Sequence, residues 1–167
     1  SDLKRCKSSL SCSSEMTENE TQMMKDASRM ASVAIRAVYP DVAIRDRLRV
    51  ECDGDRRELV ARADRGEGTR KLVYDLSEYD NIKIISFGKA SAAMALATVD
   101  VLSDSSSWSN IPARSLDGVV IIKDDHATED EIKKLNENNI LVRCASHPIP
   151  DARSVAAATE ILDLASS

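Results

Sequence analysis

The chain has few cysteines, and they are widely scattered. None of them forms a Cys-x-x-Cys pair: they are Cys6, Cys12, Cys52 and Cys144. This spacing favours unpaired thiols in a reducing compartment over a disulfide framework, and we expect Cys144 to be buried in a strand. Because the chain adds only two histidines, we predict no zinc site. No carboxylate cluster is convincing enough to assign residues to another metal.

Long apolar runs and clusters of basic residues are also lacking. No apolar run approaches the roughly 20 residues that a membrane helix needs, and no charged start leads into an apolar signal segment. We therefore expect a soluble domain that has no membrane partner. The 23 basic residues are mostly interleaved with the 28 acidic ones, and the net charge is −5. Since a nonspecific grip on nucleic-acid phosphates needs clustered Lys and Arg, we expect no nucleic-acid partner.

What is present fits a single small domain behind a polar tail. A chain of 167 residues with 43% hydrophobic residues is long enough for one compact core and too short for two large ones. Residues 1–15 are rich in serine and basic side chains, so they cannot bury enough apolar surface to become ordered. We predict that they form a flexible tail. We expect a cytoplasmic location. Alternatively, these residues are the remnant of an organelle targeting segment, and the location is mitochondrial.

A long amphipathic helix is predicted after this tail. Thr17 and Glu20 have the spacing of a capping box, which marks a helix start. Apolar residues then recur every three or four positions as far as Val38, and charged residues occupy the positions between them. Pro40 should stop the helix, because proline cannot continue the helical hydrogen bonding.

The next stretch changes to the period of a strand. Leu48 and Val50 alternate with charged residues, Asp53-Gly54 is a turn signal, and alternation resumes at Leu59. This pattern predicts a β-hairpin with one face in solvent. Residues 71–76 form either a third strand or an irregular segment that leads into the next strand.

From residue 82 onward, continuous apolar stretches alternate with helical ones, as in a parallel sheet covered by helices. Strands are predicted over 82–86, 118–122 and 140–144. Helices are predicted over 90–102, 128–138 and 152–165, with a serine-rich loop over 103–110. The fold class is therefore α/β, with a Rossmann-like parallel sheet flanked by helices and preceded by an N-terminal helix and a β-hairpin.

The first candidate site follows the first of these strands, in the segment Ser86-Phe87-Gly88-Lys89-Ala90. Ligands of open parallel sheets bind beyond the carboxyl ends of the strands, where helix N-termini attract anions. A lysine there suits a phosphate or a carboxylate. The segment is no P-loop, because it has no earlier glycine at the required spacing and Ala90 replaces the Ser or Thr. It is no dinucleotide fingerprint either, because Gly88 is the only glycine between Gly68 and Gly118. The simpler alternative is that Lys89 is a solvated lysine at a helix start.

The second candidate site follows the third strand, in the segment Ser146-His147-Pro148-Ile149-Pro150-Asp151. Asp151 is a plausible helix N-cap. His147 either makes a structural hydrogen bond or orients a substrate hydroxyl or carboxylate. The polar run Lys123-Asp124-Asp125-His126 follows the second strand. Metal binding there is conceivable, but we expect an exposed polar loop.

Three segments, taken together and in this order, resemble the N-terminal domain of class II D-glycerate 2-kinases. They are the Gly88-Lys89-Ala90 segment, the strand that starts at Gly118, and the His147-Pro148-Ile149-Pro150-Asp151 segment. The resemblance implies transfer of the γ-phosphoryl group of ATP to the 2-hydroxyl of D-glycerate, assisted by Mg²⁺. It also implies that Lys89 is catalytic. The expected substrate- or phosphate-binding residues are Ser86, Gly88, Ala90, His147 and Asp151.

The resemblance further implies that residues 16–167 are an N-terminal α/β domain that ends before the C-terminal domain of the family. That second domain would supply much of the site, so we expect the domain alone to be inactive; a homodimer is possible. Two other functions stay open. One is a noncatalytic module that binds a carboxylate or phosphate. The other is a hydroxypyruvate-type oxidoreductase, which the missing glycine fingerprint disfavours.

Overall fold

The computed structural model describes residues 17–54, 56–63, 70–103 and 115–166. The predicted flexible tail, 1–15, and residues 104–110 of the predicted serine-rich loop lie outside this part of the chain. The structure divides into two compact units, residues 1–36 and residues 37–167.

The first unit contains the predicted N-terminal helix, α1 (Glu18–Ala37). The predicted capping box is present. The Thr17 amide donates to Glu20 Oε2 at 2.8 Å, and the Glu20 amide donates to Thr17 Oγ1 at 3.3 Å. The first of these bonds lowers the pKa of Glu20, because it stabilises the carboxylate. No residue of α1 is buried.

The second unit opens with a short helix that the sequence pattern did not predict, α2 (Pro40–Arg45). Pro40 was expected to stop a helix, and α1 does end before it at Ala37. Proline also suits the first turn of a new helix, where its missing amide hydrogen has no intrahelical partner in any case. Arg45 of this helix donates to Asp100 at 2.5 Å.

The predicted hairpin is confirmed as part of an antiparallel sheet of β1 (Leu48–Asp53), β2 (Arg56–Arg62) and β3 (Lys71–Asp75). Of the two alternatives for residues 71–76, the third strand is therefore confirmed, and a single 3-10 turn, η1 (Leu76–Glu78), follows it. Half-buried Val50 and Leu59, which are partners in the β1–β2 register, pack against the main core.

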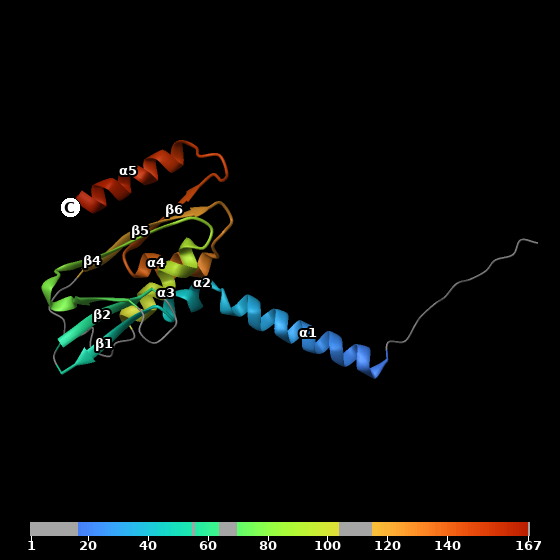
Figure 1. The fold of residues 1–167 in the computed structure, drawn as a ribbon. Helices are drawn as coiled ribbons and strands as arrows, with labels where there is room; N and C mark the ends of the chain where they lie inside the picture. The colour runs from blue at the N-terminus through green and yellow to red at the C-terminus, as the bar shows by residue number, and fades with distance from the viewer. Residues whose placement is uncertain (1–16, 55, 64–69, 104–114, 167) are drawn as a thin grey trace, which may run out of the picture. The chain divides into compact units, whose positions relative to one another are not determined.

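The predicted parallel sheet is confirmed, with strand order β4 (Asn81–Phe87), β5 (Ser115–Lys123), β6 (Ile140–Ala145). Figure 1 shows α3 (Ser91–Ser103) and α4 (Glu129–Glu137) on one face of this sheet and α5 (Ala152–Ser166) on the other. The fold of this unit is α/β, as predicted. A second capping box, between Thr128 and Glu131, starts α4.

The main core lies between the parallel sheet and α3. Small side chains such as Ala92 and Ala95 let the backbone of α3 approach Ile84 and Val120 on the sheet. The prediction that Cys144 is buried is wrong. Cys144 does lie in β6, but its side chain is exposed, because β6 is an edge strand among the described residues.

At Gly118, in the central strand β5, any added side chain should lower the stability of the domain. A Cβ at this position would overlap the carbonyl oxygen of Ile84 in the paired strand and lie 3.0 Å from its carbonyl carbon. We expect Gly118→Ala to lower the free energy of unfolding by roughly 2–3 kcal/mol in chemical denaturation. Gly54→Ala is the control. Gly54 has φ +59 and open space around it, so only backbone strain of about 1 kcal/mol should appear. Equal effects of the two variants would contradict the overlap.

Asp75 should make the stability of the domain fall at low pH. Its carboxylate accepts hydrogen bonds from the Ser77 amide and hydroxyl and from Arg56 Nε. These bonds, led by those of Ser77, lower the pKa of Asp75 to about 2. Because the folded-state pKa is depressed, the contribution is full above about pH 4 and is lost as the pH falls through about 2. Melting temperatures of the wild type and Asp75→Ala should therefore differ at pH 6 and converge toward pH 2. A difference that does not change with pH would contradict this.

Candidate functional site

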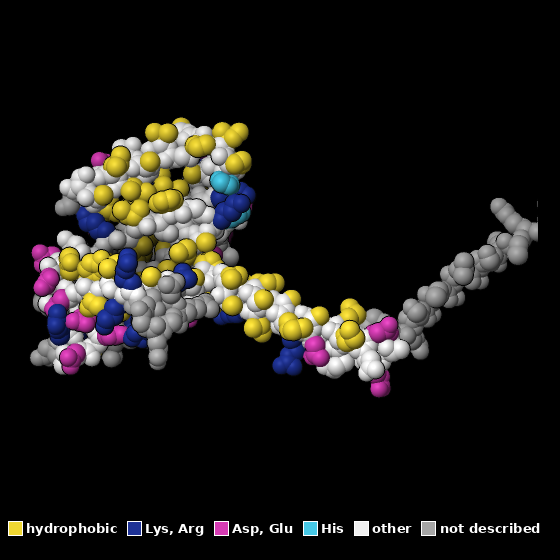
Figure 2. Space-filling model, viewed as in Figure 1, with side chains coloured by type: hydrophobic (Ala, Val, Ile, Leu, Met, Phe, Trp, Pro, Cys, Tyr) yellow, Lys and Arg dark blue, Asp and Glu magenta, His cyan; other side chains and the backbone are white. Residues whose placement is uncertain are grey.

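The two predicted site segments lie together at the carboxyl edge of the parallel sheet. A cavity of about 140 Å³ lies there. Its walls are Gly88 and Lys89 after β4, residues 121–123 at the end of β5, and residues 145–147 at the end of β6, with Ser154 in α5. In Figure 2, basic and histidine side chains gather at one end of the sheet. The structure therefore joins, in a single pocket, two motifs that are nearly 60 residues apart in the chain.

The Gly88 turn is held firmly against the central strand. Gly88 has φ +106, a conformation that favours glycine, and its amide donates to the carbonyl oxygen of Ile121 at 3.2 Å. The Ser91 hydroxyl, which is only 2% exposed, lies 2.7 Å from Gly88 O and 2.9 Å from Ile121 O. Since a hydroxyl carries one hydrogen, it shares this donor between the two carbonyls. Ser91 therefore attaches to β5 the turn on which Lys89 lies.

The predicted residues of the first segment separate into two groups. Gly88 and Lys89 line the cavity. The Lys89 side chain is exposed, and no described residue pairs with it. Ser86 and Ala90 do not line the cavity. The Ser86 hydroxyl donates to the Ser91 carbonyl at 3.2 Å. The Ala90 carbonyl accepts a hydrogen bond from the Met94 amide in the first turn of α3. The contacts of Ser86 and Ala90 therefore support the turn.

The second segment divides in the same way. His147 lines the cavity from an exposed position, next to a cis peptide bond to Pro148. The described part of the chain provides no hydrogen bond for the His147 side chain. Asp151 is the N-cap of α5, as predicted: its Oδ1 accepts from the Ser154 amide at 3.1 Å. Asp151 does not line the cavity itself, but it contacts Ser154, which does.

An arginine that the sequence pattern did not single out ties two loops together beside the cavity. Arg153 donates from Nη1 and Nη2 to the two oxygens of Asp124, at 2.8 and 2.7 Å, and from Nε to Asp151 at 2.8 Å. These bonds are the largest cause of the lowered pKa values of both carboxyl groups. They also raise the pKa of Arg153 above its ordinary value. Asp124 is half-buried rather than fully exposed as expected, because it is held in this pair.

Lys123 is a second cation in the cavity wall that the prediction passed over. Its signal was available, because it directly follows a predicted strand at the same edge of the sheet as Lys89. The neighbouring Asp125 and His126 are exposed. Among the described residues, no three or more His, Cys, Asp or Glu side chains gather where they could hold a metal ion.

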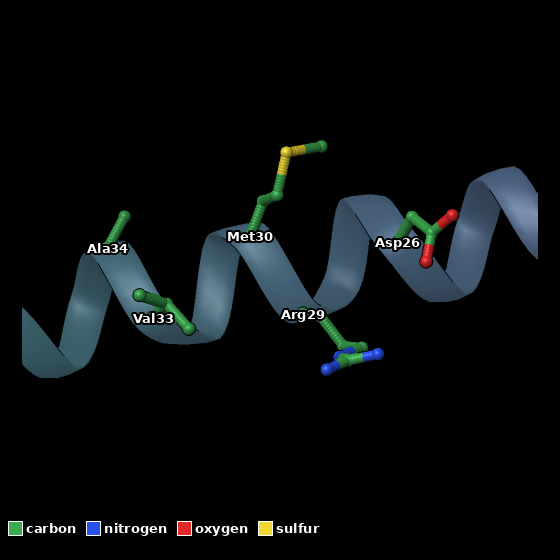
Figure 3. Close-up of a pocket in the computed structure, with 5 residues that line it drawn as sticks. All are labelled: Asp26, Arg29, Met30, Val33 and Ala34. Atoms are coloured by element: carbon green, nitrogen blue, oxygen red, sulfur yellow. The ribbon is translucent and has the colours of Figure 1, made fainter.

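A hollow along α1 is a poor alternative site. Its lining residues, Asp26, Arg29, Met30, Val33 and Ala34, all come from a single helix. Figure 3 shows Met30 and Arg29 pointing to opposite sides of that helix, so the labelled side chains do not converge on a ligand position. In the described residues no helix is both long enough and apolar enough to cross a membrane.

Comparison with known families now adds to this geometry. The family described as "Domain of unknown function (DUF4147)" matches residues 26–167. The chain belongs to this family. DUF4147 is the N-terminal domain of proteins related to class II glycerate kinases, so the predicted family is confirmed. The matched range of the chain, residues 26–167, includes every residue of the cavity wall. No match was found among curated proteins or among solved structures.

Removal of the Ser91 hydroxyl should loosen the lysine turn without unfolding the domain. Both carbonyls that it contacts keep an amide donor, from Ser91 and from Gly88, so we expect Ser91→Ala to cost only about 1 kcal/mol. Amide hydrogen exchange at Gly88 and Ser91 should become faster. Ser166→Ala, which removes an exposed hydroxyl from α5, is the control and should change stability by less than about 0.5 kcal/mol. Unchanged exchange at Gly88 in Ser91→Ala would show that the hydroxyl does not hold the turn.

Proposed function

We propose that this domain is the N-terminal part of an ATP-dependent D-glycerate 2-kinase, in which Lys89 binds the transferring phosphoryl group. The observation that carries the proposal is the single cavity that contains both Lys89 and His147. The DUF4147 family supports a glycerate-kinase-related domain. The choice of reaction, of ATP and of D-glycerate is part of the proposal.

Lys89 has the properties that phosphoryl transfer requires. This reaction needs little covalent chemistry from the protein and depends mainly on positioning and on neutralising charge. The ammonium group of Lys89 is not neutralised by any described carboxylate, and it sits on a turn that Ser91 holds against β5. The N-terminus of α3, which begins two residues later, adds a partial positive charge. Both features favour an anion next to Lys89.

The size of the cavity indicates which part of the reaction it serves. Pockets that enclose a whole drug-sized ligand span roughly 300–1,000 Å³, whereas this one is about 140 Å³. It therefore suits a phosphoryl or carboxylate group rather than a whole nucleotide. We propose that a C-terminal domain completes the site around ATP and D-glycerate, and that His147 orients a hydroxyl or carboxylate of the substrate.

The described residues do not fit a protein-held Mg²⁺ site. Mg²⁺ is usually held by one or two carboxylates together with substrate phosphates. Asp124, which follows the cavity residue Lys123, and Asp151, which contacts the cavity residue Ser154, are instead engaged by Arg153. We therefore assign no described residue to a metal and derive no step through one.

The proposal predicts that Lys89→Ala lowers kcat/KM of the complete protein at least about a hundredfold, because a charge that stabilises the transition state is lost. The measurement is an assay of ATP-dependent D-glycerate phosphorylation, with the position of the phosphate in the product read by ³¹P NMR. The matched control is Lys134→Ala, which removes an exposed lysine from α4 and should leave kcat/KM within about twofold of wild type.

Near wild-type kcat in Lys89→Ala would show that the role given to Lys89 is wrong. Failure of the complete wild-type protein to phosphorylate D-glycerate would overturn the proposed reaction. If such a protein still bound phosphate at Lys89, the noncatalytic binding module would be favoured.

A further inference from the structure

Arg153 connects the two loops that carry most of the cavity wall. Asp124 follows β5 directly after Lys123, and Asp151 ends the segment that follows β6 and contains His147. Three hydrogen bonds of 2.7–2.8 Å join these two loops through one guanidinium group. We call these residues, Asp124, Asp151 and Arg153, the arginine clamp.

From this geometry we infer that Arg153 is a positioning residue: the arginine clamp sets the distance between Lys123 on one side of the anion cavity and His147 and Ser154 on the other. The inference rests on the proposed function of the cavity. It assigns a role to three residues, none of which lines the cavity itself.

The bonding of Arg153 speaks against a direct role as a ligand of the substrate. Each of its three guanidinium nitrogens, Nε, Nη1 and Nη2, already donates to a carboxylate oxygen. The bidentate pair with Asp124 fixes the plane of the guanidinium, which a lysine cannot reproduce. Two of its five N–H donors remain, but Arg153 does not line the cavity, so an anion there meets the groups that the clamp positions.

The charge of the clamp gives the inference a sharp test. Two carboxylates and one guanidinium leave the clamp with a net charge of −1, so its electrostatic effect on a nearby anion is repulsive. If charge alone mattered, loss of Asp124 would strengthen anion binding. If the clamp acts by positioning, the same loss weakens it. The two explanations thus predict changes of opposite sign.

A second ion pair that involves α5 supplies the control. Arg143 of β6 donates from Nε to Glu160 of α5, at 2.8 Å to one carboxylate oxygen and 3.1 Å to the other. Its side-chain exposure, 39%, is similar to the 51% of Arg153. Neither Arg143 nor Glu160 lines the cavity. Arg143→Ala therefore removes an arginine–carboxylate pair on α5 that lies away from the proposed site.

The experiment compares Asp124→Ala, Arg153→Lys and Arg143→Ala with wild type in the complete protein. Affinity for inorganic phosphate is measured by calorimetry, kcat and KM for D-glycerate by assay, and folding by thermal melting. We expect Asp124→Ala and Arg153→Lys each to weaken phosphate binding about fivefold and to lower kcat/KM about tenfold, because groups held in the wrong place lose transition-state contacts. Arg143→Ala should stay within about twofold of wild type in both.

Tighter phosphate binding in Asp124→Ala, or equal losses in Arg143→Ala, would overturn the positioning role. So would wild-type affinity in Arg153→Lys, a variant that keeps the charge and should keep the fold. Absence of phosphate binding by the wild-type protein would also overturn the inference. If the wild type binds phosphate with the expected pattern among the variants but does not turn over D-glycerate, the proposed reaction fails while the positioning role stands.

Discussion

The parallel pairing of β4, β5 and β6 is the constraint on which the candidate site depends. In this register Phe87 lies opposite Ile121, and Lys123 lies opposite Ala145. All three strands therefore end at one edge, and the residues that follow them meet there. Lys89, Lys123 and His147 come from three different segments and share one cavity for this reason. A shift of this register would separate them.

Around that edge, the site is supported at two levels. Ser91 holds the Lys89 turn to the central strand through the carbonyl oxygens of Gly88 and Ile121. The arginine clamp holds the loops after β5 and β6 to each other. The exposed cationic side chain of Lys89 thus projects from a fixed backbone. Preorganised charge of this kind is what a phosphoryl-transfer site requires, because a site that must reorganise during the reaction stabilises the transition state less.

Much of the fold could be predicted from local patterns. The change from a helical to an alternating period located α1 and the hairpin, and the apolar stretches located all three parallel strands. Both site segments were found because a strand followed by a helix start has a recognisable sequence. Local patterns say less about side chains whose partners are distant. Arg153 pairs with Asp124, which is 29 positions away, and the buried Ser91 looks like an ordinary first residue of a helix.

Two other differences have physical causes that no local pattern records. The helix α2 begins at Pro40, a residue that both ends helices and starts them. Cys144 is exposed because it lies on an edge strand, and the apolar pattern of a strand does not show whether a neighbour covers it. The exposure of Cys144 could be placed only once the pairing of the strands was known.

The central claim is that the Lys89 turn and the His147 loop form a single anion site. The most direct measurement is an NMR titration of the isotope-labelled protein with inorganic phosphate, which follows the backbone amides of Lys89, Ala90, Ser146 and His147. The account predicts that all four amides shift and that they saturate with one common dissociation constant. Shifts confined to one of the two segments, or two clearly different constants, would contradict it.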